Sequence, residues 1–177
     1  YTTVMRGVPD LVMMLLVFYG GQVLLNVVID HFGWDFIEID PFVAGVLTIG
    51  LIFGAYFTET FRGAFLAVSA GQLEAGRAYG MSAWQVFRRI LFPQMLRFAL
   101  PGIGNNWLVL LKSTAIVSMI GLSDMTRIAD QAGRSTHQPF TFYLAVCVLY
   151  LAMTALSSYG LGLLMRRYSA GVRETQV

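Results

Sequence analysis

The feature that most constrains this chain is a series of four long apolar runs, each about as long as a membrane-spanning helix. Because an α-helix rises about 1.5 Å per residue, about 20 apolar residues cross the hydrocarbon layer of a bilayer. None of the runs has the basic start and small-residue cleavage site of a signal peptide. We therefore predict four transmembrane helices, over residues 11–29, 42–66, 98–122 and 140–165.

The composition agrees with a protein whose surface faces lipid. Only 12% of the residues are charged and the mean hydropathy is +0.65, whereas a soluble domain carries about 25% charged residues. The sequence therefore indicates an integral membrane protein. Its formal charge of +2 is too small to indicate a nucleic-acid partner. The single cysteine, Cys147, lies inside an apolar run and can form no disulfide within the chain.

Arginine residues are divided unequally between the two sides of the predicted membrane. If the polar segment 69–93 is cytoplasmic, the opposite side carries only Arg127 and Arg134, and its first loop, 30–40, is acidic. This division follows the positive-inside rule and puts both ends of the chain in the cytoplasm. Because the chain begins at Tyr1 within an apparent connector, we expect a fragment without its natural start. The arginines assigned to the cytoplasm are Arg6, Arg62, Arg77, Arg88, Arg89, Arg97, Arg166, Arg167 and Arg173.

Small residues and a proline indicate where the predicted helices pack and bend. Gly50 and Gly54 form a GxxxG pair, preceded by Gly45, and small residues let helices approach closely in lipid. Simple helix packing is the favoured interpretation. Pro101, with glycines after it, predicts a kink or a break near the start of the third span.

The polar segment 69–93 predicts two short helices joined at Gly80. Its apolar positions fit an amphipathic helix, and Gly80 can adopt the positive φ of a turn at low cost. Ser82 is the expected N-cap of the second helix, and Pro93 is expected to end it. From the residues alone, the segment is equally compatible with an interfacial anchor and with a contact surface for a partner.

The order of residues in this segment resembles a known motif. Glu74-Ala75-Gly76, Gly80, Ile90 and Phe92-Pro93 are spaced as in the EAA loop of ATP-binding-cassette (ABC) importer permeases, with Gly76 and Phe92 replacing Ala and Leu. RGVPD, YFTETFRGAF, ALPGIGNNW and LKSTA are similar to motifs of the polar-amino-acid branch, although Asp10 and Ser113 depart from its usual residues. The similarity covers nearly the whole chain and is greatest to the Q-type subunit of histidine and lysine–arginine–ornithine importers.

The resemblance implies an all-α integral membrane fold, a MetI-like helix bundle of which four of five transmembrane helices are present here, in a bacterial inner membrane. It also implies that segment 69–93 is a coupling loop that docks on an ATPase. The residues matched to the docking surface are Glu74, Ala75, Gly76, Arg77 and Gly80.

The same resemblance implies a set of partners. These are a homologous second permease subunit forming a heterodimer, two cytoplasmic ATPase subunits and a periplasmic amino-acid-binding protein. The sequence has no P-loop motif, so ATP is expected on the ATPase subunits and no cofactor is expected in this chain. No metal-ligand spacing and no nucleophile–base pattern occurs, so the chain is expected to be no enzyme.

Polar residues inside the apolar runs are the candidates for a substrate path. Lys112 is expected to bind a substrate carboxylate, neutralise a helix C-terminus or pair across a heterodimer, and a structural partner is favoured. Glu59 either pairs with Arg62, three residues away, or meets the cationic side chain of a basic amino acid. Other candidates for the path are Asn105, Asn106, Gln22 and Asn26.

The function expected from the resemblance is inward passage of a basic L-amino acid, driven by ATP hydrolysis on partner chains. One alternative is the same machinery with another polar or opine-type amino acid as cargo. Two alternatives of another class are a stand-alone secondary transporter or channel, and a structural membrane anchor.

Overall fold

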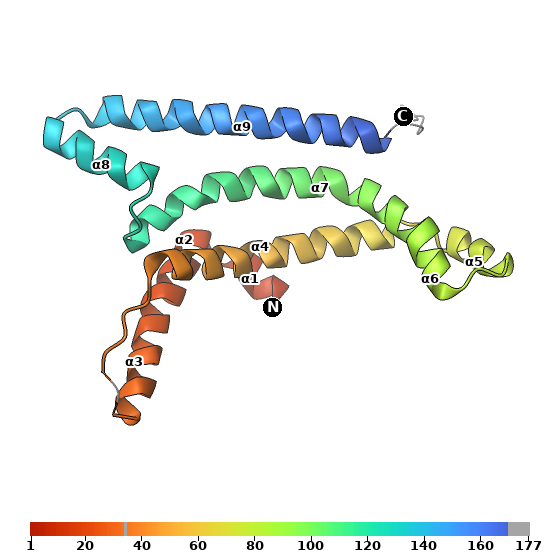
Figure 1. Ribbon diagram of the computed structural model, residues 1–177, viewed down its shortest axis with the longest axis horizontal. Coiled ribbons are helices and arrows are strands. Elements are labelled where there is room, and N and C mark those ends of the chain that lie inside the picture. Colours follow the sequence, from red (N-terminus) through yellow and green to blue (C-terminus); the bar gives the residue numbers. More distant parts are fainter. Residues whose placement is uncertain (34, 170–177) are drawn as a thin grey trace. The chain divides into compact units, whose positions relative to one another are not determined.

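The computed structural model describes residues 1–33 and 35–169, and within these residues every regular element is helical (Figure 1). Arg173, assigned above to the cytoplasm, lies outside the described residues. The elements are α1 (Thr2–Gly7), α2 (Asp10–Leu15), the π-helix η1 (Leu16–Gly20), α3 (Gly21–His31), α4 (Pro41–Leu66), α5 (Ala70–Ala78), α6 (Ala83–Val86), the π-helix η2 (Phe87–Leu91), α7 (Phe92–Ser113), the 3₁₀-helix η3 (Thr114–Ile120), α8 (Met125–Thr136) and α9 (Pro139–Ser169).

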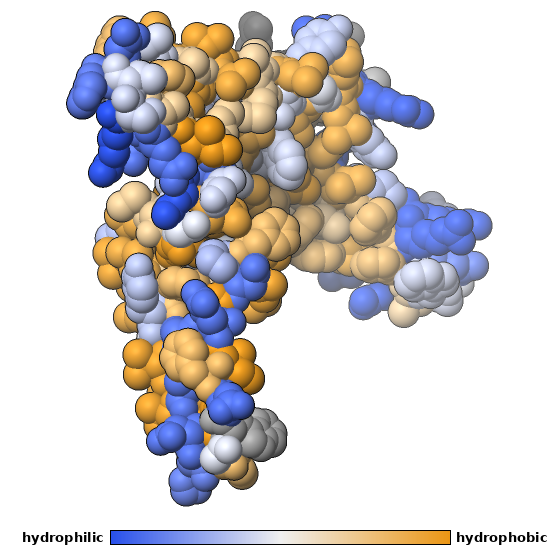
Figure 2. All heavy atoms as spheres, turned by 60° about the vertical axis from the view of Figure 1, so that its left-hand side comes forward, coloured by the Kyte–Doolittle hydropathy of each residue, from blue (hydrophilic) through white to orange (hydrophobic). Residues whose placement is uncertain are grey.

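Four helical stretches of the described chain are long and apolar enough to cross a membrane. In the last stretch, only 6% of the most apolar part is buried. Large side chains along it are exposed, among them Leu156 at 74%. Figure 2 shows how much apolar surface the molecule exposes on one face. Contact with lipid accounts for this exposed apolar surface, because exposing so much apolar surface to water would be energetically unfavourable. The stretches are Asp10–His31, Pro41–Leu66, Ala83–Ile120 and Pro139–Tyr168.

Neither proline of the third stretch breaks the helix, so the expected stop at Pro93 and a break at Pro101 are both wrong. The π-helix η2 ends at Leu91, two residues before Pro93, and the N–H of Phe92 donates to the carbonyl of Phe87, five residues back. This change of register admits a ring that lacks an N–H and would clash with a carbonyl in a regular turn. α7 likewise continues through Pro101.

The chain forms two compact units, and the first contains residues 1–56 and 109–154. Its core is built from Met14 of α2, Ala44 of α4, and Val117 and Ile120 of η3. The contact between α4 and η3 depends on Gly45, because a Cβ atom there would lie 2.8 Å from Cγ1 of Val117. The glycine allows the two backbones to approach as small residues do in membrane helices.

The expected GxxxG pair has a different environment. Among the described residues, no atom outside the local backbone of α4 lies within 4 Å of the position of a Cβ atom at Gly50, and at Gly54 the near atom is the Tyr1 hydroxyl at 3.2 Å. Gly45, and not the Gly50–Gly54 pair, therefore makes the closest glycine contact of α4 within the first unit.

Gln22 and Asn26 hold the loop that precedes α4. The N–H of Ile39 donates to Oε1 of Gln22 at 2.7 Å, and Nε2 of Gln22 donates to the carbonyl of Ile37 at 2.6 Å. Asn26 accepts from the N–H of Ile37 at 3.1 Å. These two side-chain amides supply the hydrogen-bond partners that the extended backbone of the loop would otherwise lack. Their side chains are thus engaged by the loop.

Among the described residues, the second unit contains residues 57–108 and 155–169. Its core joins the end of α4 to the start of α7 through Ala64, Val68, Met95 and Ala99. A Cβ atom at Gly102 of α7 would lie only 2.6 Å from Cγ2 of Thr60 on α4. α9 packs along the same unit, where Arg97 Nε donates to the carbonyl of Tyr168 at 2.9 Å.

The packing at Gly102 predicts that Gly102→Val destabilises the protein by about 2 kcal/mol, the usual cost of overpacking a close contact. Thr60 is a short side chain and cannot withdraw far from a Cβ atom 2.6 Å away. Thermal unfolding of the purified protein in detergent is the measurement. Gly160→Val is the matched control, because nothing lies within 4 Å of a Cβ atom at Gly160. Equal melting temperatures for the two variants would contradict the assigned contact.

Candidate functional site

The polar segment folds as a hairpin of α5 and α6 whose turn is set by Gly80. Gly80 has φ +78°, in the left-handed region that glycine adopts without steric cost. Its N–H donates to the carbonyl of Arg77 at 2.9 Å, and the N–H of Met81 donates to that of Gly76 at 3.1 Å. This pair of bonds is a Schellman motif, and it satisfies carbonyls that end α5. The positive φ predicted at Gly80 is confirmed.

The second arm of the hairpin begins with a complete capping box. Ser82 Oγ accepts from the N–H of Gln85 at 3.4 Å, and Oε1 of Gln85 accepts from the N–H of Ser82 at 2.8 Å. Ser82 is therefore the N-cap that the sequence predicts. Because both arms have their terminal backbone groups satisfied at the turn, the hairpin has a defined conformation.

The predicted coupling residues divide into an exposed set and a buried one. Glu74, Ala75 and Arg77 are exposed, whereas Gly76 is buried between the two arms. A Cβ atom at Gly76 would lie 2.6 Å from Cδ1 of Ile90 and 3.4 Å from Cγ2 of Val86. Glycine in the place of the motif's second alanine thus lets the arms pack more closely, and the exposed residues present the outward face.

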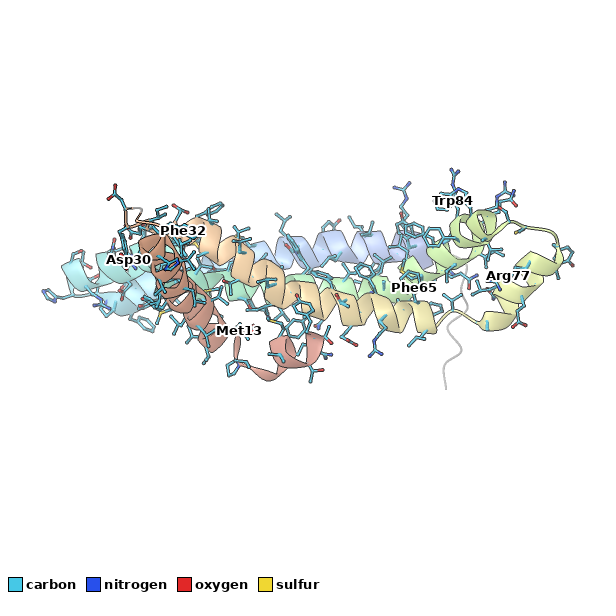
Figure 3. All side chains as sticks on the ribbon, turned by 90° about the horizontal axis from the view of Figure 1, so that it is seen from below. Met13, Asp30, Phe32, Phe65, Arg77 and Trp84 are labelled. Atoms are coloured by element: carbon cyan, nitrogen blue, oxygen red, sulfur yellow. The ribbon has the colours of Figure 1, made fainter. Side chains whose placement is uncertain are left out.

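Two exposed aromatic residues at the hairpin were not identified as surface groups from the sequence. Tyr79, next to Gly80, is 87% exposed, and Trp84 at the start of α6 is 65% exposed. The ring of Trp84 stacks on Phe87 with centroids 5.5 Å apart. Figure 3 labels Arg77 on α5 and Trp84 on α6. For Tyr79, the signal available in the sequence was its position directly before the turn glycine, Gly80.

Glu59 and Arg62, candidates for a substrate contact or an ion pair, form the ion pair. Nη2 and Nε of Arg62 donate to Oε2 of Glu59 at 2.7 and 3.0 Å. The three-residue spacing on α4 puts both side chains on one face of the helix.

The remaining path candidates lie in different environments. Asn106 is buried, and its Nδ2 donates to the hydroxyl of Thr60 at 2.9 Å, so it ties α7 to α4. Asn105, one residue earlier, is exposed. Lys112 belongs to the other compact unit, where it is exposed in the last turn of α7.

The turn geometry predicts that Gly80→Ala loosens the hairpin. An alanine at φ +78° meets the left-handed penalty of about 1–2 kcal/mol, so the two bonds of the Schellman motif open more often. Hydrogen exchange of the Gly80 and Met81 amide positions is the measurement, and it should become faster. Gly71→Ala, a change in the first turn of α5 where φ is not positive, is the control and should leave both rates unchanged. Equal protection in the two variants would contradict this account.

Comparison with known proteins identifies the family. Residues 1–170 match the model of the family described as "Binding-protein-dependent transport system inner membrane component". The chain is 57% identical over 177 residues to the histidine/lysine/arginine/ornithine transport system permease protein HisQ of Salmonella typhimurium, covering all of this chain and 78% of that protein. It is 45% identical to the octopine transport system permease protein OccQ of Rhizobium meliloti, covering 98% of this chain and 73% of that protein.

A solved structure agrees in fold and sequence. A crystal structure of an amino acid ABC transporter with histidines matches with a TM-score of 0.78 and 37% identity, covering 94% of this chain and 73% of that chain. The predicted family and MetI-like helical fold are therefore confirmed. This chain belongs to the binding-protein-dependent transport system inner membrane components, and it is a membrane-spanning permease subunit of the ABC importer type.

Proposed function

We propose that this chain passes a basic L-amino acid, namely histidine, arginine, lysine or ornithine, inward across a bacterial inner membrane. The support is its 57% identity to HisQ, whose name carries these four cargoes. An opine-type amino acid is the second candidate, because the chain is also 45% identical to an octopine permease. Uptake of labelled arginine in competition with histidine, glutamine and octopine separates the two.

The chain is proposed to work within a larger assembly. Its partners are a homologous second permease subunit in a heterodimer, two cytoplasmic ATPase subunits and a periplasmic amino-acid-binding protein. ATP is bound and hydrolysed by the ATPase subunits, because this sequence carries no P-loop. The role of this chain is conduction and coupling, without chemistry of its own.

The observation that carries the coupling role is the hairpin of α5 and α6. Its exposed Glu74, Ala75 and Arg77 are proposed to dock in a groove of the ATPase, while Gly76 and Gly80 fix the conformation that presents them. α6 continues through η2 into α7 as one helical stretch of 38 residues. A push on the hairpin therefore reaches a transmembrane span as a rigid-body movement, which is the displacement that alternating access needs.

The membrane orientation follows from the order of spans and the distribution of charge. One span separates the hairpin from α8, so these two segments are proposed to face opposite sides of the membrane. Since arginines gather with the hairpin, that side is the cytoplasm. α8 and the acidic loop before α4 then face the periplasm.

Glu59, Asn105, Asn106 and Lys112 are proposed as residues along the cargo path. Asn105 is the strongest of them, because its side chain is exposed while its neighbour Asn106 is held by Thr60. Glu59 is proposed to take part in the cargo path as a member of its ion pair with Arg62. Lys112 is exposed in the last turn of α7 and offers a positive charge that a carboxylate can approach.

Charge reversal tests the coupling role. Glu74→Lys should abolish ATP-driven uptake by the reconstituted full transporter, because an exposed contact to the ATPase changes sign while the fold is untouched. Glu38→Lys is the matched control, an equal charge change at an exposed residue of the loop proposed to face the periplasm. Uptake and substrate-stimulated ATP hydrolysis are the measurements. Wild-type rates in Glu74→Lys would favour a structural anchor, and flux without ATPase subunits would favour a secondary transporter or channel.

The two asparagines should separate transport from stability. Asn105→Ala is expected to slow uptake at unchanged melting temperature. Asn106→Ala is expected to lower the free energy of unfolding by about 1 kcal/mol, because it removes the bond from Asn106 Nδ2 to Thr60. Unchanged uptake by Asn105→Ala would remove Asn105 from the path.

A further inference from the structure

The first compact unit holds a polar pocket that the coupling hairpin and the path residues do not include. The pocket has a volume of about 500 Å³ and is bounded by η3, α8 and the start of α9. A cavity of this size is in the range of small-molecule sites. Its polar lining residues include Ser118, Thr126, Arg127, Asp130, Arg134 and Tyr143.

The carboxylate in the pocket is already neutralised by the protein. Nε of Arg134 lies 3.0 Å from Oδ2 of Asp130, and the Tyr143 hydroxyl donates to Oδ1 at 2.9 Å. The hydrogen bond from Arg134, and then that from Tyr143, hold the pKa of Asp130 below its ordinary value. Asp130 is therefore ionised at neutral pH and is matched in charge by Arg134.

Arg127 is the second cation of the pocket, and it has no such match. Its Nη1 donates to the carbonyl of Ser118 at 3.3 Å, and within residues 1–33 and 35–169 it forms no ion pair. Among the residues that line the pocket, Asp130 and Arg134 balance, which leaves the charge of Arg127. The nearby carboxylate of Asp124 accepts from the backbone N–H of Arg127 at 2.9 Å and does not line the pocket. A guanidinium with donors to spare is suited to a planar carboxylate, which it can bind through two parallel hydrogen bonds.

The wall of the pocket also contains a polar atom that the described chain leaves without a partner. Oγ1 of Thr126 is buried and has no hydrogen-bond partner among the described residues. Buried hydroxyls are normally hydrogen-bonded. Because this oxygen is buried from solvent, Thr126 belongs to the wall of the pocket and is not one of its ligands.

We propose that this pocket binds the α-carboxylate of an amino acid on the periplasmic side, with Arg127 as its main ligand. The orientation and the amino-acid cargo rest on the function proposed above. A site of net positive charge attracts the carboxylate and not a cationic side chain. It therefore binds the part that all α-amino acids share, and it acts as an entry site without selecting among them.

The test adds a negative charge to the pocket without removing a contact. Gln131 lines the pocket and is exposed, so Gln131→Glu should fold normally and repel a carboxylate. Gln138→Glu is the matched control, because Gln138 is exposed between α8 and α9 and does not line the pocket. The probe is free L-arginine, compared with agmatine, its decarboxylated analogue, on the complete transporter in lipid nanodiscs without binding protein.

The expected result is weaker arginine binding to Gln131→Glu by about tenfold or more, as expected for a charge placed a few ångströms from a carboxylate. Gln138→Glu should match the wild type, and agmatine binding should not change in either variant. Arg127→Lys keeps the charge but loses the paired hydrogen bonds, and it should bind arginine less tightly than the wild type. Equal arginine binding by Gln131→Glu and Gln138→Glu overturns the proposal, as does equal binding of arginine and agmatine by the wild type.

Two further measurements show whether the bound carboxylate belongs to the free amino acid or to the binding protein, and whether a negative result refutes the pocket or the proposed function. If Gln131→Glu weakens binding of the arginine-loaded binding protein and leaves free arginine binding unchanged, the carboxylate belongs to that protein and the entry site is wrong. ATP-driven arginine uptake by the wild type tests the proposed function separately. Uptake that persists while the two glutamate variants bind arginine alike refutes the pocket alone, whereas a wild type without amino-acid uptake refutes the proposed function.

Discussion

The lack of water in a bilayer is the constraint on which the rest of this structure depends. An unpaired backbone group in hydrocarbon costs several kcal/mol, so a spanning segment must satisfy its hydrogen bonds within itself. The chain meets this demand even where its sequence opposes a helix. At Pro93 it does so with a π turn. Irregular backbone occurs where side chains or turns can compensate for it.

Glycine residues lie at the closest contacts between the helices. Close contacts at Gly45, Gly76, Gly102 and Gly133 each lack room for a Cβ atom, and each joins two different elements. Lipid supplies no hydrophobic drive for association, so contact area gained by close approach is what holds helices together. At the hairpin the same device serves a mechanical purpose, because Gly76 lets Ile90 seat against α5 and keeps the two arms together.

Much of this arrangement was predictable from the sequence, for physical reasons that are local. Span number follows from apolar length, the positive φ of Gly80 from its place after a short helix, and the capping box from Ser82 with Gln85 three residues on. What was not predictable depends on distant partners. The sequence does not tell which glycine meets Val117, nor that Asn106 turns to Thr60 while Asn105 does not.

Neither of the two proposed sites contacts the side chain of the cargo, and this has a consequence for selectivity. The hairpin is proposed to contact the ATPase and not the cargo, and the pocket at Arg127 is proposed to bind the carboxylate that all α-amino acids share. Neither would distinguish histidine from an opine. The chain is 57% identical to the permease HisQ and 45% identical to an octopine permease. If both sites act as proposed, cargo choice rests on other positions inside the spans or on the binding protein, because neither site contacts the side chain in which the cargoes differ.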